Sequence, residues 1–183
     1  MLIRPETSML LHIDLQERLM PAITGGADVL VNAIWLTRIA RRLDIPVGAT
    51  VQYPKGLGPT LQALDAELRP GETVEKIHFS AMRENRLNAL TGFDRPQIVV
   101  TGTESHVCVL QTVLDLCAAG KQVFVVADAV ASRNPRDLAL ALTRMQSAGT
   151  NIVSREMVAF EWLEKAGTEV FREISQNYLR QQG

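Results

Sequence analysis

The sequence is poor in cysteine, in aromatic residues and in charge of one sign. Two of its 183 residues are cysteines, and Phe, Trp and Tyr together make up 5%. Two thiols without a CxxC spacing form neither a disulfide framework nor a zinc cluster. Cys108 and Cys117 lie nine residues apart on one predicted helix, so at about 100° per residue they point to opposite sides and should not pair. Disulfide-stapled and zinc-finger proteins are therefore excluded.

The chain also lacks a charge excess and a long apolar run. Its 19 Lys and Arg nearly balance its 20 Asp and Glu, which argues against a nucleic-acid or membrane partner. No apolar run approaches the roughly 20 residues of a membrane span. The N-terminus MLIRPETS leads straight into a strand-like segment, so we expect no signal peptide and a cytoplasmic location. The length suits one domain, residues 1–183, with its own core.

Short apolar runs alternate along the chain with stretches of helical periodicity. The runs that predict strands are residues 8–13, 47–51, 73–79, 98–100, 122–127 and 152–153. Helical patterns lie between them, and two further helices are expected to reach Gln181. This order predicts the α/β class: a three-layer α/β/α, Rossmann-like open parallel sheet with helices on both faces.

One stretch, residues 95–121, combines a strand and a helix around a cysteine. The β-branched run 98–100 indicates a buried strand, Gly102 breaks it, and a helical pattern then continues to Gly120. Cys108 therefore sits where a parallel strand has ended and a helix begins. Ligands collect at this place in α/β sheets, and the positive helix end favours a thiolate. Cys108 is the candidate nucleophile.

Two further side chains belong near the same edge of the predicted sheet. Asp14 directly follows strand 8–13, although it could merely cap a turn. Lys76 lies in segment 73–79, where a lone lysine usually faces solvent. If they meet Cys108, Asp14 can take the thiol proton and Lys76 can stabilise the thiolate. Backbone N–H groups around Glu104 could receive an oxyanion.

Other readings of the same elements are weaker. His12 lies deeper than the strand end and is expected to be a satisfied core histidine. His106 precedes Cys108 by two residues on a starting helix, so the side chains point about 200° apart and a Cys–His dyad is awkward. A dinucleotide site needs G-x-G-x-x-G after a strand, and Gly102 is followed by no second glycine in register.

Four motifs together resemble the isochorismatase-like cysteine hydrolases, a superfamily that includes nicotinamidases and N-carbamoylsarcosine amidase. The motifs are LLHIDLQERL, VEKIHFSAM, VVTGTESHVCVLQTVLDL and VFVVADAVASR. The loop QYPKGLGPT is most similar to the isochorismatase domain-containing subgroup. The resemblance spans nearly the whole chain and implies the isochorismatase-like hydrolase fold.

The resemblance implies a catalytic triad of Asp14, Lys76 and Cys108. Asp14 would deprotonate Cys108, whose thiolate would attack a small amide-like C–N substrate and form a thioester that water hydrolyses. The family also carries a cis non-proline peptide, which here would join Thr103 to Glu104. The backbone N–H groups of Glu104 and Cys108 would then form the oxyanion hole.

The substrate pocket is expected within the same motifs. Its predicted residues are Leu19, Gln52, Tyr53, Phe79 and Thr103. Tyr53 could instead pack its own loop. Nicotinamidases carry an Asp-x-His metal motif where this chain reads VQYP, so we expect no metal and no cofactor. The expected partners are a small-molecule substrate and, because relatives commonly assemble, further copies of the chain in a homo-oligomer.

Isochorismatases that cleave a vinyl ether lack the cysteine, which favours the thiol-dependent branch for this chain. Two other functions stay open. The chain could be a weakly active or non-catalytic partner-binding protein, or a thiol-based redox or detoxification protein. Alkylation of Cys108 well below pH 8 would indicate an activated thiol.

Overall fold

Six parallel strands form one open sheet in the computed structural model, which describes residues 1–180. The strands are β1 (Ser8–Ile13), β2 (Val47–Gln52), β3 (Thr73–Lys76), β4 (Gln97–Thr103), β5 (Gln122–Ala131) and β6 (Asn151–Val153). Their order across the sheet is β3-β2-β1-β4-β5-β6. The predicted α/β class and open parallel sheet are confirmed.

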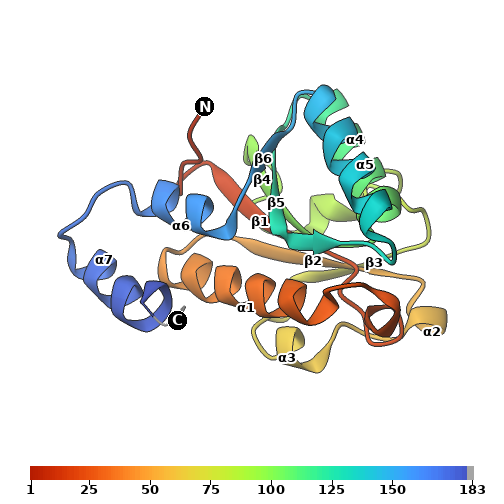
Figure 1. The fold of residues 1–183 in the computed structure, drawn as a ribbon, viewed down its shortest axis with the longest axis horizontal. Coiled ribbons are helices and arrows are strands. Elements are labelled where there is room, and N and C mark those ends of the chain that lie inside the picture. Colours follow the sequence, from red (N-terminus) through yellow and green to blue (C-terminus); the bar gives the residue numbers. More distant parts are fainter. Residues whose placement is uncertain (181–183) are drawn as a thin grey trace.

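Helices cover both faces of this sheet (Figure 1). They are α1 (Gly26–Arg42), α2 (Pro54–Leu57), α3 (Gln62–Asp65), α4 (Leu110–Ala118), α5 (Pro135–Ser147), α6 (Arg155–Leu163) and α7 (Glu169–Ile174), with short 3₁₀ helices at Met20–Ala22 and Arg86–Ala89 and π-helical turns at Ser105–Val109 and Ser175–Leu179. Ile39 of α1 and Trp162 of α6 pack in the core on one face, whereas Val113 of α4 and Met145 of α5 pack on the other. Within residues 1–180, every helix is too short or too polar to cross a bilayer.

The carboxyl ends of β1 and β4 lie side by side at the centre of the sheet. From β1 the chain continues outward to β2 and β3, and from β4 it continues the opposite way to β5 and β6. Ligands bind in the crevice at such a switch point. Gly102 of β4 has φ +130°, and a Cβ there would lie 2.1 Å from the carbonyl oxygen of Ile13. Only glycine allows β4 to pass this close behind the end of β1.

Some boundaries differ from the sequence prediction. β5 does not end before Asp128 but runs on to Ala131, because Val130 and Ala131 resume pairing with β4 after a register shift. The predicted strand 73–79 ends at Lys76, and a 3₁₀ helix at Arg86–Ala89 follows it before β4. The expected helix end at Gln181 lies outside the described residues.

Asn134 and Pro135 define the start of α5. The Asn134 side chain accepts a hydrogen bond from the Arg136 backbone N–H at 2.9 Å, and Pro135 occupies the first helical position. A proline there has no hydrogen bond to lose, and its fixed φ suits the first turn.

Candidate active site

Asp14 and Lys76 form a buried ion pair at the carboxyl edge of the sheet. Lys76 Nζ lies 2.7 Å from Asp14 Oδ2, and the two side chains are 1% and 0% exposed. The second carboxylate oxygen, Oδ1, accepts a hydrogen bond from the Thr50 hydroxyl at 2.7 Å. The usual expectation that a strand lysine faces solvent is therefore wrong for Lys76. The Asp14 carboxylate bonds these two side chains rather than the backbone of a turn.

The Lys76 ammonium has an acceptor for each of its N–H groups. Besides Asp14, it donates to Gln52 Oε1 at 2.6 Å and to the backbone carbonyls of Phe79 at 3.1 Å and His78 at 3.4 Å. A buried charge is tolerated only when it is paired and hydrogen-bonded in this way. Two of these four acceptors, the carbonyls of His78 and Phe79, come from the loop that follows β3, so the lysine and that loop hold each other in place.

Cys108 is the fourth residue of the π-helical turn Ser105–Val109, which follows β4 directly. It is 5% exposed. Burial and the Asp14 carboxylate raise the pKa of its thiol and the Lys76 ammonium lowers it, so that together they bring this pKa to about 12. The structure thus brings the three predicted residues together, with the Cys108 thiol next to the Asp14–Lys76 ion pair. The thiolate expected from the helix end is not the resting form, because burial and Asp14 outweigh that effect.

A cavity of about 430 Å³ opens onto Cys108. It is lined by Leu19, Ala22, Gln52, Leu57, Phe79, Glu104, Val107, Cys108 and Arg133. Three of the predicted pocket residues, Leu19, Gln52 and Phe79, line this cavity. Tyr53 and Thr103 are not among the lining residues.

The structure gives Tyr53 and Thr103 other positions. Tyr53 is half exposed, and its ring lies directly against Gly56, so it packs its own loop. Thr103 is fully buried behind the cavity, where its hydroxyl donates to the Asp14 backbone carbonyl at 2.8 Å. It supports the turn that carries Asp14 rather than the cavity wall.

Sequence reasoning missed the side chains of Glu104 and Arg133 at the cavity. Arg133 Nε lies 2.7 Å from Glu104 Oε1, which pairs the two charges at the cavity wall. His106 turns away from Cys108: its Nδ1 lies 3.0 Å from the Ser132 hydroxyl and its Nε2 lies 3.5 Å from Glu104 Oε2. No Cys–His dyad forms here. Arg133 lies in the motif VFVVADAVASR, but nothing in a lone arginine identifies its partner.

Gln16 is a further residue that the sequence did not single out. Its Nε2 donates to the backbone carbonyls of Gln52 at 3.0 Å and Gly58 at 2.7 Å, and its Oε1 accepts from the Gln52 backbone N–H at 2.8 Å. The Gln52 side chain then donates to the Ile77 carbonyl at 2.5 Å while it accepts from Lys76. Gln16 thereby fixes the strand end that orients the ammonium.

His12 is a core histidine, as the sequence predicts. Its Nε2 lies 2.8 Å from the Thr37 hydroxyl and its Nδ1 lies 2.6 Å from the Thr101 hydroxyl. The Thr37 hydroxyl donates to the Ala33 carbonyl, so it accepts from His12 Nε2–H and leaves Nδ1 as an acceptor. Burial lowers the pKa of His12 to about 3, and the ring is neutral.

The peptide bond between Thr103 and Glu104 is trans, like every other peptide bond in residues 1–180. The family resemblance implied a cis bond here, and that expectation is wrong for this structure. A trans bond is the lower-energy form before a non-proline residue. Glu104 makes the turn into the π-helical segment with φ −43° and ψ 109°.

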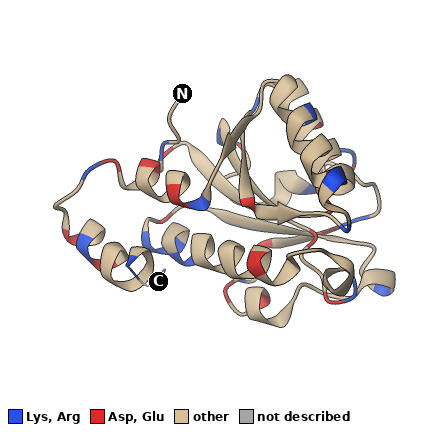
Figure 2. Cartoon of the chain, viewed as in Figure 1, with Lys and Arg blue, Asp and Glu red and all other residues tan. Residues whose placement is uncertain are grey.

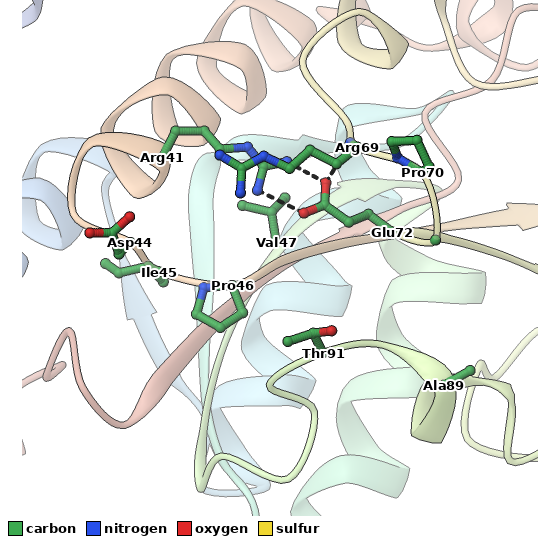
Figure 3. A pocket seen from close by; sticks show the side chains of 11 residues that line it. Arg41, Asp44, Ile45, Pro46, Val47, Arg69, Pro70, Glu72, Ala89 and Thr91 are labelled. Atoms are coloured by element: carbon green, nitrogen blue, oxygen red, sulfur yellow. Dashed lines mark hydrogen bonds and ion pairs between the residues drawn. The ribbon is translucent and has the colours of Figure 1, made fainter.

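A different cavity, of about 480 Å³, lies at the opposite edge of the sheet (Figure 3). It is formed by the end of α1, the start of β2 and the turn before β3, and it contains none of the predicted site residues. Its Arg41 is bound at two points by Glu72, with Nη1 2.8 Å from Oε1. Within residues 1–180, no three His, Cys, Asp or Glu side chains are grouped to hold a metal ion. The candidate site is the cavity at Cys108.

Comparisons with known proteins identify the family to which the chain belongs. Residues 8–157 match the family model described as "Isochorismatase domain". Isochorismatase domain-containing protein 2 of Danio rerio is 38% identical over 169 residues, 91% of this chain and 84% of that protein. Isochorismatase family protein 1A of Dictyostelium discoideum is 35% identical, over 93% of this chain and 85% of that protein.

Solved structures share the fold. A Caenorhabditis elegans structure described as MAR1 ribonuclease superimposes with a TM-score of 0.90 at 33% identity, over 98% of this chain and 93% of that one. The Escherichia coli YcaC gene product, described as an octameric hydrolase of unknown specificity, has a TM-score of 0.88 at 22% identity, over 98% of this chain and 92% of that one. The chain therefore belongs to the isochorismatase family.

Proposed function

We propose that this protein is a cysteine-dependent hydrolase of small amide-like C–N substrates, with Asp14, Lys76 and Cys108 as its catalytic residues. Membership of the isochorismatase family supports a hydrolase. The observation that carries the finer proposal is that Cys108 lines a 430 Å³ cavity and lies beside the buried Asp14–Lys76 ion pair. A cavity of this size suits a small molecule.

The first half of the reaction forms a thioester. As the Cys108 sulfur attacks the carbonyl carbon of the amide, the thiol proton passes to Asp14. The developing oxyanion is received by the backbone N–H groups of Glu104 and Cys108 at the start of the helix. Asp14 then returns its proton to the nitrogen, and the C–N bond breaks with release of ammonia or an amine.

The second half regenerates the thiol. A water molecule loses a proton to Asp14 and attacks the thioester carbon, and the C–S bond breaks. The proton on Asp14 returns to the Cys108 sulfur, and a carboxylic acid leaves. In both halves, Asp14 becomes a carboxylate again after it has passed on the proton. The positive charge of the Lys76 ammonium favours that carboxylate form.

The charges at the cavity favour a small molecule over a nucleic acid. The C. elegans relative is described as a ribonuclease. Ribonucleic acid binding needs several cations that neutralise phosphates. The one arginine at this cavity is paired with Glu104, and Lys, Arg, Asp and Glu are interspersed over the molecule (Figure 2). We therefore assign the cavity to an amide rather than to RNA.

A library of small amides, assayed for released ammonia or amine, tests the proposal. Cys108→Ala should abolish turnover with an unchanged circular dichroism spectrum, whereas Cys117→Ala should retain it. Wild-type turnover in Cys108→Ala would remove the nucleophile. Turnover of no amide, combined with reversible oxidation of Cys108 by peroxide, would favour the redox function instead.

We also propose that the chain self-associates, since Leu2, Met157 and Phe160 leave large apolar side chains exposed. Sedimentation velocity measures the assembly directly, and a 20.2 kDa species at micromolar concentration would contradict it.

A further inference from the structure

We propose that Phe79 divides an elongated substrate site into two subsites, and that the outer subsite holds the substituent carried by the substrate amide. The inference rests on the proposed function, because it takes Cys108 as the reacting centre. It concerns a surface that neither the family match nor the catalytic residues assign.

Two cavities meet at Phe79. The inner one contains Cys108. The outer one, of about 510 Å³, is lined by Ile77, His78, Phe79, Ser80, Arg83 and Gln111. Phe79 is the residue common to both, so it is the partition between them.

The helix that begins at Ser105 gives an independent link between the two cavities. Val107 and Cys108 line the inner cavity, and Gln111 lines the outer one. Residues three and four apart lie on one helix face, about one 5 Å turn along the axis. The two cavities are thus consecutive along a single face of this helix, with the thiol at the inner end.

The backbone of the partition is held in place, whereas its ring is not part of the core. The Phe79 carbonyl accepts from Lys76, and the Ile77 and His78 backbone N–H groups each donate to Glu84 Oε1 at 2.8 Å. The Phe79 side chain itself is 53% exposed and belongs to no core cluster. Truncating it should remove the wall and leave the fold in place.

The outer cavity favours an uncharged polar group. Its Arg83 is neutralised by Asp115, with Nε 2.9 Å from Oδ2, and Ser80 donates its hydroxyl to the same carboxylate at 2.7 Å. The side-chain amide of exposed Gln111 supplies both a donor and an acceptor. The substrate class is an N-substituted amide whose substituent has an apolar part beside Phe79 and a neutral polar end.

Alkylation of Cys108 by probes of two lengths tests the partition. Iodoacetamide is small enough to fit within the inner cavity, whereas N-(4-carbamoylbenzyl)iodoacetamide is longer and carries an apolar ring with a neutral polar end. In each case the Cys108 sulfur forms a bond to the methylene carbon, the C–I bond breaks, iodide leaves and the thiol proton passes to solvent. Site-resolved mass spectrometry separates Cys108 from Cys117 and gives the ratio of long-probe to short-probe rate constants.

Phe79→Ala should raise the ratio of long-probe to short-probe rate constants about tenfold. This is the low end of the change in rate expected when a pocket gains room for an apolar group. Adding Gln111→Trp, which fills the outer cavity from the helix side, should reverse the gain. Tyr53→Ala is the matched control, since Tyr53 is an equally exposed aromatic residue that lines neither cavity. An unchanged ratio in Phe79→Ala, or an equal rise in Tyr53→Ala, would overturn the proposal.

Failure of the nucleophile gives a different result. If Cys108 reacts with neither probe, the proposed hydrolase function fails. The role of Phe79 as a partition is then tested by the equilibrium binding of N-(4-carbamoylbenzyl)acetamide, measured by NMR titration. Phe79→Ala should bind about tenfold more tightly than wild type, and the double variant should not. Equal affinities across the variants would overturn the partition independently of the thiol.

Discussion

Opposite substitutions in the buried ion pair should move the titration of the Cys108 thiol in opposite directions. Asp14 raises the pKa of this thiol through its charge and hydrogen bonding, and Lys76 lowers it by the same means. Asp14→Asn removes the negative charge with little change of shape, so the thiol pKa should fall. Lys76→Met removes the positive charge, so the thiol pKa should rise above the wild-type value.

The size of the effect follows from the resting pKa. With a thiol pKa of about 12, about one molecule in 10,000 carries a thiolate at pH 8. A charge within a few ångströms shifts a neighbouring pKa by about 1 to 3 pH units. At a fixed pH below the thiol pKa, we therefore expect alkylation of Cys108 to be about ten or more times faster in Asp14→Asn and about ten or more times slower in Lys76→Met.

Iodoacetamide labelling at pH 9 and above is the assay, because the thiolate fraction of Cys108 grows as the pH approaches the thiol pKa. Cys117 provides an internal reference in every variant. Asp14→Asn should combine this faster alkylation with hydrolysis lowered by about 10²–10⁴, because the general base is lost. Shifts of the same sign in both variants, or none, would refute the placement of the two charges beside the sulfur.

Three further predictions concern the scaffold and the nucleophile. His12 has a pKa of about 3 in the folded protein against an ordinary value of 6.5, so between these pH values the unfolded chain binds one more proton and stability falls as the pH drops. Between pH 8 and pH 5, wild type should therefore lose about 2 kcal/mol more unfolding free energy than His12→Gln. Urea titrations at the two pH values measure the difference. Gly102→Ala should lower the unfolding free energy by about 3 kcal/mol or more, since its Cβ would meet the Ile13 backbone, and a loss below 1 kcal/mol would contradict the close approach. Cys108→Ala should abolish hydrolysis while the urea midpoint changes little, because the substitution removes only the sulfur atom; retained activity would point to another nucleophile.

The fold could be predicted because its signals are local. The strand 8–13 is a continuous apolar run that ends at Asp14, and the structure has β1 at those residues. Asn134 and Pro135 specify the start of α5 through their own backbone chemistry. Where a boundary depends on distant pairing, local patterns fail: β5 continues past Asp128 only because Gly102 and Thr103 of β4 are there to pair with it.

The site could be predicted in part, because residue types indicate chemistry but not partners. A carboxylate and a cysteine at strand ends are visible in the sequence. The burial of Lys76 is not, because its acceptors include Gln52 on another strand and the carbonyl of Phe79 on its own loop. The pairing of Glu104 with Arg133 could not be predicted either, because the two residues are distant in the sequence and neither one indicates its partner.

The hydrogen bonds of Lys76 also restrict what it can do in the proposed reaction. An ammonium has three N–H groups, and here Asp14, Gln52 and the Phe79 carbonyl accept all three at 2.6–3.1 Å. None of the three is left to protonate a leaving nitrogen. The proton that the amine needs must therefore come from Asp14, which has just received it from the thiol, and Lys76 acts as a fixed charge. Local patterns favour a solvent-exposed lysine, and such a lysine would lack these acceptors. Its N–H groups would then be free to donate a proton, a role that the structure leaves to Asp14.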